Sequence, residues 1–263
     1  MDLQLQDKVV LVTASSKGLG KATALEFAKE GATVLLSSRN EETLAKTVKE
    51  IKDLTNNPNI HYKTCDMSSV EEINDLFKWI SQGFSGVDIL INNTGGPTAG
   101  GFKDLVDDDW IAAFEKNLLS YIRTTRAVLP HMTANVFGRI INIASSSTKE
   151  VIDGLILSNT FRSGMVGLTK SLAREYAKHN ILVNTVGAGR IATDRVAELD
   201  QIVADQQSVS IEEIIKTSKS LIPIGRYGQP EEFAKVLLFL ASPANTYMTG
   251  QSLIIDGGML KAL

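Results

Sequence analysis

The stretch KVVLVTASSKGLG, residues 8–20, decides the fold class of this chain. Residues 8–12 form a continuous run rich in β-branched side chains, which is typical of a strand buried on both faces of a sheet. A turn of small residues follows and contains Gly18 and Gly20. Residues 22–29 then show helical spacing that stops before Gly31, so the stretch predicts a strand, a tight turn and a helix in succession.

The same alternation continues along the rest of the chain. Strands are expected at residues 8–12, 33–37, 60–65, 87–91, 138–143, 181–186 and 252–255. Helices are expected at residues 22–29, 41–54, 70–81, 109–129, 162–178 and 231–240, with a polar helical excursion over 193–220. Strands separated by helices of this length indicate βαβ units. The prediction is an α/β fold: a Rossmann-type, doubly wound, seven-stranded parallel sheet in a single domain over residues 1–263.

The composition narrows the class of partner. A net charge of −3 over 263 residues gives no basic face for a nucleic acid, and no apolar run reaches the roughly 18 residues of a membrane helix. Cys65 is the only cysteine and the chain start is not leader-like, which together favour a cytoplasmic location. His61, His131 and His179 lack ligand spacing, so no metal site is expected.

The glycine turn is a candidate phosphate-binding loop, because glycines permit a tight bend and close approach of backbone to a pyrophosphate. Gly18 and Gly20 fit that role, but Ala14 stands where the usual pattern has its first glycine. Two glycines after a strand are also common in purely structural turns. Polar residues after other strands strengthen the functional interpretation: Asp66 follows the third strand, and residues 92–95, NNTG, follow the fourth.

Six segments together resemble the short-chain dehydrogenase/reductase family in order and spacing: residues 13–20, 66, 92–95, 117, 145 and 184–193. The similarity covers about residues 6–258, and residues 138–193 resemble bacterial 3-oxoacyl-carrier-protein reductases without a gap. It implies a dinucleotide cofactor, a small carbonyl or alcohol substrate, and a homo-oligomer (dimer or tetramer) formed through the helices at 109–129 and 162–178. The cofactor-binding residues that it implies are Thr13, Ser15, Ser16, Lys17, Gly18, Leu19, Gly20, Ser38, Arg39, Asp66, Met67, Asn93, Thr94, Gly95, Arg162, Gly189, Ile191 and Thr193.

The end of the second strand bears on the choice of cofactor. NAD-preferring members of the family carry an Asp at the position of Ser38, where a carboxylate accepts hydrogen bonds from the ribose hydroxyls and repels a 2′-phosphate. Here Arg39 follows Ser38, and Lys17 is expected beside the same phosphate position. Two cations and no carboxylate favour NADP(H), since both pair well with phosphate. The alternative is that both are solvated surface charges.

The catalytic positions depart from the family's Asn, Ser, Tyr and Lys. Asn117 and Ser145 fit the first two. The Tyr position falls on Ser158, and the Lys position, one helical turn later, falls on Arg162. Misalignment is a poor explanation, because the following residues 167–175 match the family well. A serine hydroxyl is a much weaker acid than a tyrosine, and a guanidinium is a poor proton relay although it can stabilise an alkoxide.

Three interpretations remain open. In the first, Arg162 and Ser145 polarise a carbonyl, and water or Ser158 delivers the proton. In the second, another side chain supplies the acid, with candidates Lys149, Glu150, Asp153 and Arg190. In the third, the domain binds NADP(H) without turnover, as a sensor or assembly protein. The first two are favoured, because Asn117 and Ser145 have little purpose outside the chemistry.

The substrate side is less specific in sequence. Analogy alone points to a 3-oxoacyl thioester or a similar 3-oxo compound. Residues 193–220 have apolar spacing among many polar residues, which fits either a substrate lid or two amphipathic surface helices. The glycine-rich stretch 95–101 fits either a widened entrance or an ordinary loop.

Overall fold

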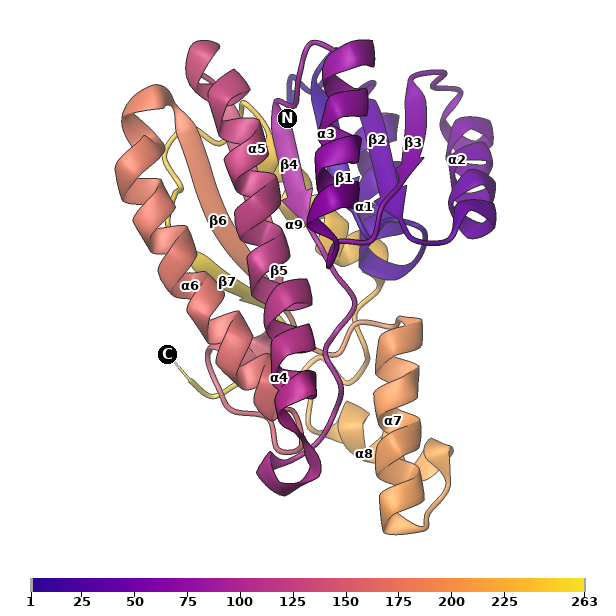
Figure 1. Ribbon diagram of the computed structural model, residues 1–263. Helices are drawn as coiled ribbons and strands as arrows, with labels where there is room; N and C mark the ends of the chain where they lie inside the picture. The colour runs from indigo at the N-terminus through magenta and orange to yellow at the C-terminus, as the bar shows by residue number, and fades with distance from the viewer. Residues whose placement is uncertain (1, 263) are drawn as a thin grey trace.

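Strands and helices alternate along the chain in the computed structural model, which describes residues 2–262 (Figure 1). The strands are β1 (Val9–Thr13), β2 (Thr33–Ser38), β3 (Ile60–Thr64), β4 (Ile89–Asn92), β5 (Gly138–Ser145), β6 (Ile181–Ala188) and β7 (Ser252–Ile255). The helices are α1 (Gly18–Lys29), α2 (Glu41–Thr55), α3 (Val70–Gly83), α4 (Asp107–Phe114), α5 (Ser120–Ala134), α6 (Ile156–Tyr176), α7 (Asp194–Gln207), α8 (Ile211–Ser220) and α9 (Pro230–Ala241). Short 3-10 turns lie at Phe102–Asp104, Ser146–Thr148 and Ala177–His179, and a π-helical turn lies at Glu115–Leu119.

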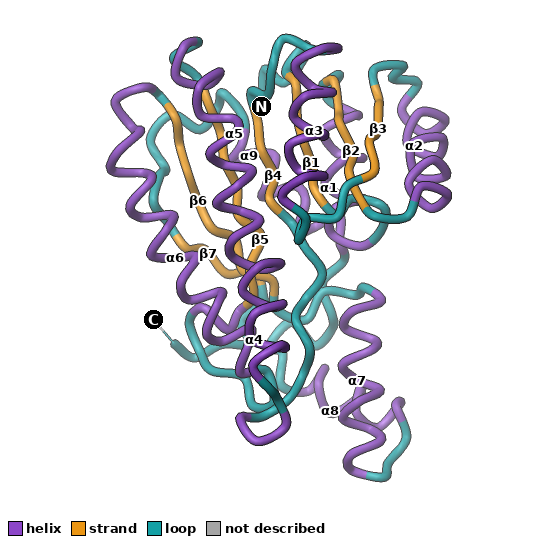
Figure 2. Tube along the Cα trace, viewed as in Figure 1, coloured by secondary structure: helices purple, strands orange, loops and turns teal. Residues whose placement is uncertain are grey.

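The strands form one seven-stranded parallel sheet in the order β3-β2-β1-β4-β5-β6-β7 (Figure 2). The predicted Rossmann-type fold is therefore confirmed. The chain runs outward from β1 through β2 to β3 and then returns to place β4 on the other side of β1. This reversal leaves a crevice at the carboxyl ends of β1 and β4, which is where doubly wound sheets bind ligands.

Side chains alternate along the strands and so fill two separate cores, one on each face of the sheet. Val10 and Val12 pack on one face with residues from α1, α2 and α9. Val9 and Leu11 pack on the other face with residues from α3 and α5, and α6 lies against the same side (Figure 1). Both faces of β1 are buried, which is why this strand reads as a continuous apolar run.

Two element boundaries differ from the sequence prediction in ways that matter for the site. The helix expected at 109–129 is divided into α4 and α5 by the π-helical turn at Glu115–Leu119. The helix expected to begin at residue 162 begins at Ile156 instead, so Ser158 and Arg162 lie on one continuous helix. Hydrophobic spacing could not place the helix start, because residues 158–164 are largely polar or small.

Candidate functional site

A large cleft opens at the carboxyl ends of β1 and β4, at the switch point of the sheet. Its volume is about 630 Å³, within the range of small-molecule and cofactor sites. Of the predicted catalytic residues, Ser145, Ser158 and Arg162 line it. The predicted cofactor residues that line it are Ser16, Lys17, Gly18, Leu19, Ser38, Arg39, Asp66, Met67, Asn93, Thr94, Gly95, Arg162, Gly189, Ile191 and Thr193.

The remaining predicted residues, which do not line the cleft, are Thr13, Ser15, Gly20 and Asn117. The Thr13 hydroxyl donates to the Asn93 carbonyl at 2.7 Å and accepts from the Asn93 amide at 2.8 Å, which ties the end of β1 to the end of β4. The Ser15 hydroxyl donates to the Val12 carbonyl at 2.8 Å and accepts from the Ser37 amide at 3.0 Å. These hydroxyls therefore hold the turn in place and do not face a ligand.

The glycine turn is close-packed against the start of α1. A Cβ at Gly20 would lie 2.5 Å from the Ala14 carbonyl oxygen and 2.8 Å from Ser15 Cα, so no side chain fits there. Gly18 has a φ of +57°, and Ala14 has a φ of +45°, a left-handed conformation that costs about 1–2 kcal/mol for a residue with a Cβ. The N-cap residue Lys17 makes no side-chain capping hydrogen bond, which leaves the first N–H groups of α1 available beside Gly18 and Leu19 at the cleft.

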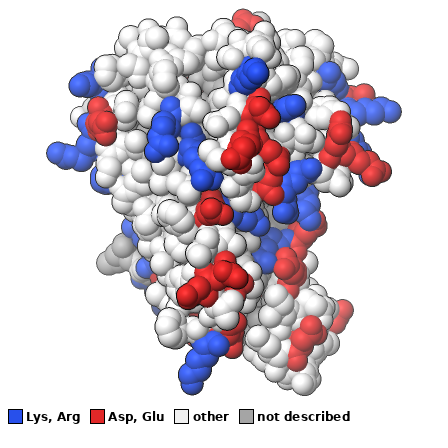
Figure 3. Space-filling view, viewed as in Figure 1, with Lys and Arg blue, Asp and Glu red and all other residues white. Residues whose placement is uncertain are grey.

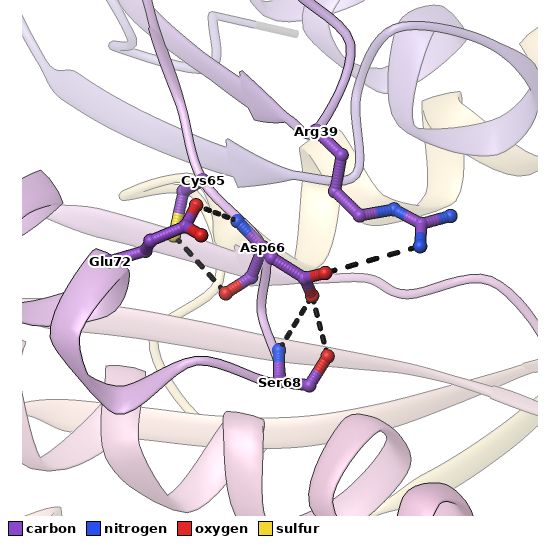
Figure 4. A network of polar contacts seen from close by, with 5 residues as sticks. All are labelled: Arg39, Cys65, Asp66, Ser68 and Glu72. Atoms are coloured by element: carbon purple, nitrogen blue, oxygen red, sulfur yellow. Dashed lines mark hydrogen bonds and ion pairs between the residues drawn. The ribbon is translucent and has the colours of Figure 1, made fainter.

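A polar network surrounds Asp66, which lines the cleft (Figure 4). One Asp66 carboxylate oxygen accepts from the Ser68 amide at 2.9 Å and from the Ser68 hydroxyl at 2.6 Å, and the other lies 4.0 Å from Arg39 Nη1. The Glu72 carboxylate accepts from the Asp66 amide at 2.7 Å. Burial raises the pKa of Asp66, but the Ser68 hydrogen bonds and the Arg39 charge outweigh it, so the pKa lies below its usual value.

Lys17 was predicted to converge with Arg39 on one phosphate position, and the structure pairs it differently. Its Nζ lies 2.9 Å from Asp194 Oδ2 at the start of α7. Both side chains are about three-quarters exposed, so the pair bridges the cleft mouth in contact with solvent. Asp194 is 177 residues away in the sequence, and no spacing rule could connect it to Lys17.

Lys116 is a cleft-lining cation that the sequence analysis did not single out. It lies in the π-helical turn, and its Nζ is 3.3 Å from the position of a Cβ on Gly95. Burial lowers the pKa of Lys116, Arg39 lowers it further, and Asp66 acts in the opposite sense. Its one sequence signal is its place next to Asn117. Basic side chains gather where α7 meets the rest of the molecule (Figure 3). Lys116 is one of the cations that line the cleft.

The Arg162 guanidinium joins several of the predicted residues at the inner end of the cleft. Arg162 is 6% exposed, and its Nη1 donates to the Ile143 carbonyl and lies 3.4 Å from the Tyr121 hydroxyl. Its Nη2 donates to Asn117 Oδ1 at 3.4 Å, and the same oxygen accepts from the Thr94 hydroxyl at 3.2 Å. The structure thus brings Asn117 and Arg162 together, with Asn117 fully buried behind the cleft wall.

Three serines are linked by hydrogen bonds, and two of them, Ser145 and Ser158, line the cleft together with Arg162. Ser158 Oγ lies 3.2 Å from Ser147 Oγ, and Ser145 Oγ accepts from the Ser147 amide at 3.1 Å. Ser147 therefore links the two predicted catalytic serines, although the sequence analysis missed it. A signal existed in the run of serines at 145–147, which follows β5 directly.

The alternative acid groups lie elsewhere. None of Lys149, Glu150 and Asp153 is among the described residues that line the cleft, and all three are exposed. Arg190 pairs instead with Asp200, which is 1% exposed and also accepts from the Tyr227 hydroxyl at 2.9 Å. The geometry gives the second interpretation no proton donor in the cleft from this set.

Helix α7 forms one wall of the cleft. Val196 and Leu199 line it together with Leu155 and Pro97, which gives that part of the cleft an apolar surface. Arg195 Nη2 donates to the Pro97 carbonyl at 2.8 Å and so connects α7 to the stretch 95–101. Among the described residues, none from α8 lines the cleft.

Within residues 2–262, no group of three or more His, Cys, Asp or Glu side chains is arranged to hold a metal ion. No helix in that range has both the length and the apolar character required to cross a bilayer.

Comparisons with known proteins cover almost the whole chain. A family model described as "Enoyl-(Acyl carrier protein) reductase" matches residues 13–260. The 3-oxoacyl-[acyl-carrier-protein] reductase FabG of Aquifex aeolicus is 37% identical over 261 residues, 98% of this chain and 100% of that protein. An actinorhodin polyketide ketoreductase variant, solved with NADPH, superposes with a TM-score of 0.92 at 35% identity, covering 96% of this chain and 97% of that one. YwfH, an NADPH-dependent reductase involved in bacilysin biosynthesis, superposes with a TM-score of 0.93 at 29% identity, covering 98% of this chain and 100% of that one.

Proposed function

The chain belongs to the short-chain dehydrogenase/reductase family, and we propose that it is an NADP(H)-dependent oxidoreductase, a carbonyl reductase or alcohol dehydrogenase with an atypical active site. The single observation that carries the proposal is the placement of Ser145, Ser158 and Arg162 on the wall of the same cleft as the glycine turn. Cofactor-type and reaction-type residues are then within one continuous site. The NADPH-dependent reductases among the similar structures support the same cofactor.

The residues of the cleft suit a dinucleotide phosphate. The space that a Cβ at Gly20 would fill is already occupied by the turn backbone, so α1 starts close to the cleft with uncapped N–H donors for a pyrophosphate. Arg39 would meet a 2′-phosphate beside Ser38, a position where a carboxylate would repel it. Lys17 would join Arg39 at that phosphate only by exchanging its exposed partner Asp194 for it. Asp66 would accept from an adenine amino group. The backbone near Ile191 would hold the carboxamide of the nicotinamide, and Thr193 would reach toward the phosphates.

The mechanism assigns a charge-stabilising role to Arg162. When bound, the reduced dinucleotide would supply the hydride. Arg162 and the Ser145 hydroxyl polarise the substrate carbonyl, and Arg162 stabilises the negative charge that develops on its oxygen. Asn117 and the Ile143 carbonyl hold the guanidinium in place. Ser158, hydrogen-bonded to Ser147, or a water molecule delivers the proton to that oxygen.

A panel of ketones and alcohols with NADPH or NADP⁺ tests the reaction. Turnover that persists in Ser158→Ala and is lost in Arg162→Ala supports the mechanism, with water as the proton source. Tight NADPH binding without turnover on any substrate contradicts it and favours the alternative of a catalytically silent NADP(H)-binding sensor or assembly protein. Arg174→Ala is the matched control, because Arg174 is an exposed residue of the same helix and lies outside the cleft lining.

The choice of cofactor has a test of its own. Arg39→Asp should weaken NADPH binding by about 10- to 100-fold, since hydrogen bonds to charged groups are worth about 1.5–3 kcal/mol. Arg174→Asp makes the same charge change far from the cleft and should leave the dissociation constant unchanged. Equal affinity of the unmodified protein for NADH and NADPH would contradict the assignment.

Further parts of the proposal rest on the family. A 3-oxoacyl thioester or similar 3-oxo compound is the starting substrate class, given the reductases that the chain resembles. The segment 193–220 is proposed as the substrate lid, since Val196 and Leu199 line the cleft.

A homodimer or homotetramer would bury the exposed Ile111 and Phe114 of α4. Sedimentation velocity tests this oligomeric state. The cytoplasmic location stays a prediction.

A further inference from the structure

The described part of the chain contains two well-buried arginines, Arg139 and Arg162, and they are satisfied differently. The Arg139 guanidinium donates to four backbone carbonyls through Nε, Nη1 and Nη2, so all of its edges are occupied. Arg162 uses Nη1 for Ile143 and Tyr121 and one Nη2 hydrogen for Asn117. Its Nε makes no hydrogen bond to any described residue, although the side chain lines the cleft. Arg139 is structural, whereas Arg162 keeps one edge available.

The available edge of Arg162 carries two parallel donors. The Nε–H and the second Nη2–H lie side by side on a planar guanidinium, and this spacing matches the two oxygens of a carboxylate. No described carboxylate lies within ion-pair distance of Arg162. A largely buried cation without an anionic partner is costly, so an anion delivered by a ligand would be bound favourably at this position.

The Ser145 and Ser158 hydroxyls line the same cleft as Arg162 and add O–H donors to it. Ser145 accepts a hydrogen bond through its Oγ and still has its own O–H to donate. Of the Ser147 and Ser158 hydroxyls, one O–H is used between them and the other is available. Ser158 and Arg162 both line the cleft and lie one turn apart on α6. We call Ser145, Ser158 and Arg162 the donor corner.

The other guanidinium of the substrate wall does not offer the same site. Arg195 directs Nη2 to the Pro97 carbonyl and Nη1 to Glu198 at 2.9 Å, and the Glu198 carboxylate already neutralises it. The apolar Leu155, Val196 and Leu199 line the same cleft as the donor corner. A ligand that matches this wall has one anionic head and an apolar body.

From these contacts we infer that the substrate is a free oxo acid whose carboxylate and carbonyl group share the available edge of Arg162. One carboxylate oxygen accepts from one of the two N–H groups, and the carbonyl oxygen accepts from the other and from the Ser145 hydroxyl. The inference rests on the proposed reductase function and narrows it, because it selects free 2-oxo and 3-oxo acids over the neutral esters and thioesters of the same compounds. The carboxylate is not changed in the reaction. The carbonyl carbon gains a hydride from the dinucleotide and its oxygen gains a proton, so the product is a hydroxy acid.

Matched pairs of acid and ester test the inference by turnover. The probes are 4-methyl-2-oxopentanoate with its methyl ester, and acetoacetate with ethyl acetoacetate. The acid of at least one pair should have a kcat/KM about 10- to 100-fold above that of its ester, as expected for a charge-assisted two-point contact. Arg162→Lys should reduce this ratio to near one, because a point cation lacks the two-donor edge. Arg174→Lys on the same helix should leave the ratio unchanged. Equal kcat/KM for acid and ester in both pairs would overturn the inference and leave the reductase function standing.

Calorimetry separates this inference from the proposed function. The non-reducible 4-methylpentanoate should bind the protein, alone or with NADP⁺, at least 10-fold more tightly than 4-methylpentanamide. That preference should fall in Arg162→Lys and, as a second variant in case the first misfolds, in Ser158→Val, which narrows the donor corner. Absence of any carbonyl turnover with this preference intact would refute the reductase and keep the carboxylate site. Equal binding of acid and amide would refute the site.

Discussion

Replacing Gly20 by alanine tests how the start of α1 is held against the cofactor turn. The added Cβ would lie 2.5 Å from the Ala14 carbonyl oxygen, 2.8 Å from Ser15 Cα and 2.9 Å from Asn93 Nδ2. Two of these neighbours are backbone atoms that no rotamer change can move. Ordinary contact is about 3.5 Å, so the helix start must shift by about 1 Å.

The cost follows from that shift. Overpacking of this kind costs about 1–3 kcal/mol, and replacing a helical glycine by alanine returns about 0.5–1 kcal/mol. Gly20→Ala should therefore lower the free energy of unfolding by up to about 2 kcal/mol. For a protein of this size each kcal/mol lowers Tm by about 2–4 °C, which gives a fall of about 4–8 °C. NADPH affinity should fall as well, since the N–H donors of α1 move with the helix.

Differential scanning calorimetry and NADPH titration measure both effects. Gly167→Ala is the matched control, because Gly167 lies in α6 and a Cβ there would meet nothing within 4 Å. This variant should gain about 0.5–1 kcal/mol with NADPH binding unchanged. A Tm and an NADPH dissociation constant for Gly20→Ala within error of the unmodified protein would refute the argument from close packing.

Three further predictions concern the same cleft. Ala14→Gly should raise Tm by about 2–4 °C. It relieves about 1–2 kcal/mol of left-handed strain at φ +45°, which exceeds the entropic cost of about 0.5–1 kcal/mol for a glycine, and a lower Tm would show that the strain is absent. Lys116→Gln should weaken NADPH binding and lessen its salt dependence, as measured by fluorescence titration at several ionic strengths. Folding lowers the pKa of Lys116, so the unfolded chain binds more protons than the folded one between that lowered pKa and 10.5. The contribution of Lys116 to the free energy of unfolding therefore rises with pH through that window. Denaturant titrations of Lys116→Gln should lack this rise. Cys65 should resist alkylation by iodoacetamide in the native protein at pH 8. Burial, with the charges of Glu72 and Asp66, raises the pKa of its thiol from 9.0 to about 12, which lowers the thiolate fraction about 1,000-fold. Mass spectrometry follows the labelling, and rapid modification of Cys65 would contradict the prediction.

Most of the scaffold was predictable from local sequence, because its signals are local. Residues 8–12 read as a strand buried on both faces, and β1 differs from that range by one residue at each end. Residues 252–255 are β7 without any shift. The turn at 13–20, Asp66 and the NNTG segment all follow strands, and a parallel sheet brings the carboxyl ends of its strands to one edge. Their common cleft follows from topology once the alternation of strand and helix is known.

The parts that escaped prediction depend on side chains that meet across long sequence separations. Lys17 and Asp194 are 177 residues apart, and Arg195 reaches Pro97 over 98 residues. The π-helical turn that carries Lys116 has no signature in hydrophobic spacing. The partners of Arg162 come from the π-helical turn, α5 and β5, and only the packed molecule shows which of its N–H groups are used and which are available.

The geometry of Arg162 also bears on whether a site of this kind can turn over. A positioned general acid such as tyrosine contributes about 10²- to 10⁴-fold to a rate, and a preorganised donor at a developing oxyanion contributes about 10²- to 10³-fold. The two contributions overlap in size, so exchanging the first for the second does not by itself end catalysis. The guanidinium is held by Ile143 and Asn117 before any substrate arrives, which is the preorganisation that such stabilisation requires. Proton delivery by Ser158 or water then contributes less, because the charge on the oxygen is already stabilised when the proton is transferred. This balance is the physical ground for favouring a reductase over a silent binding protein.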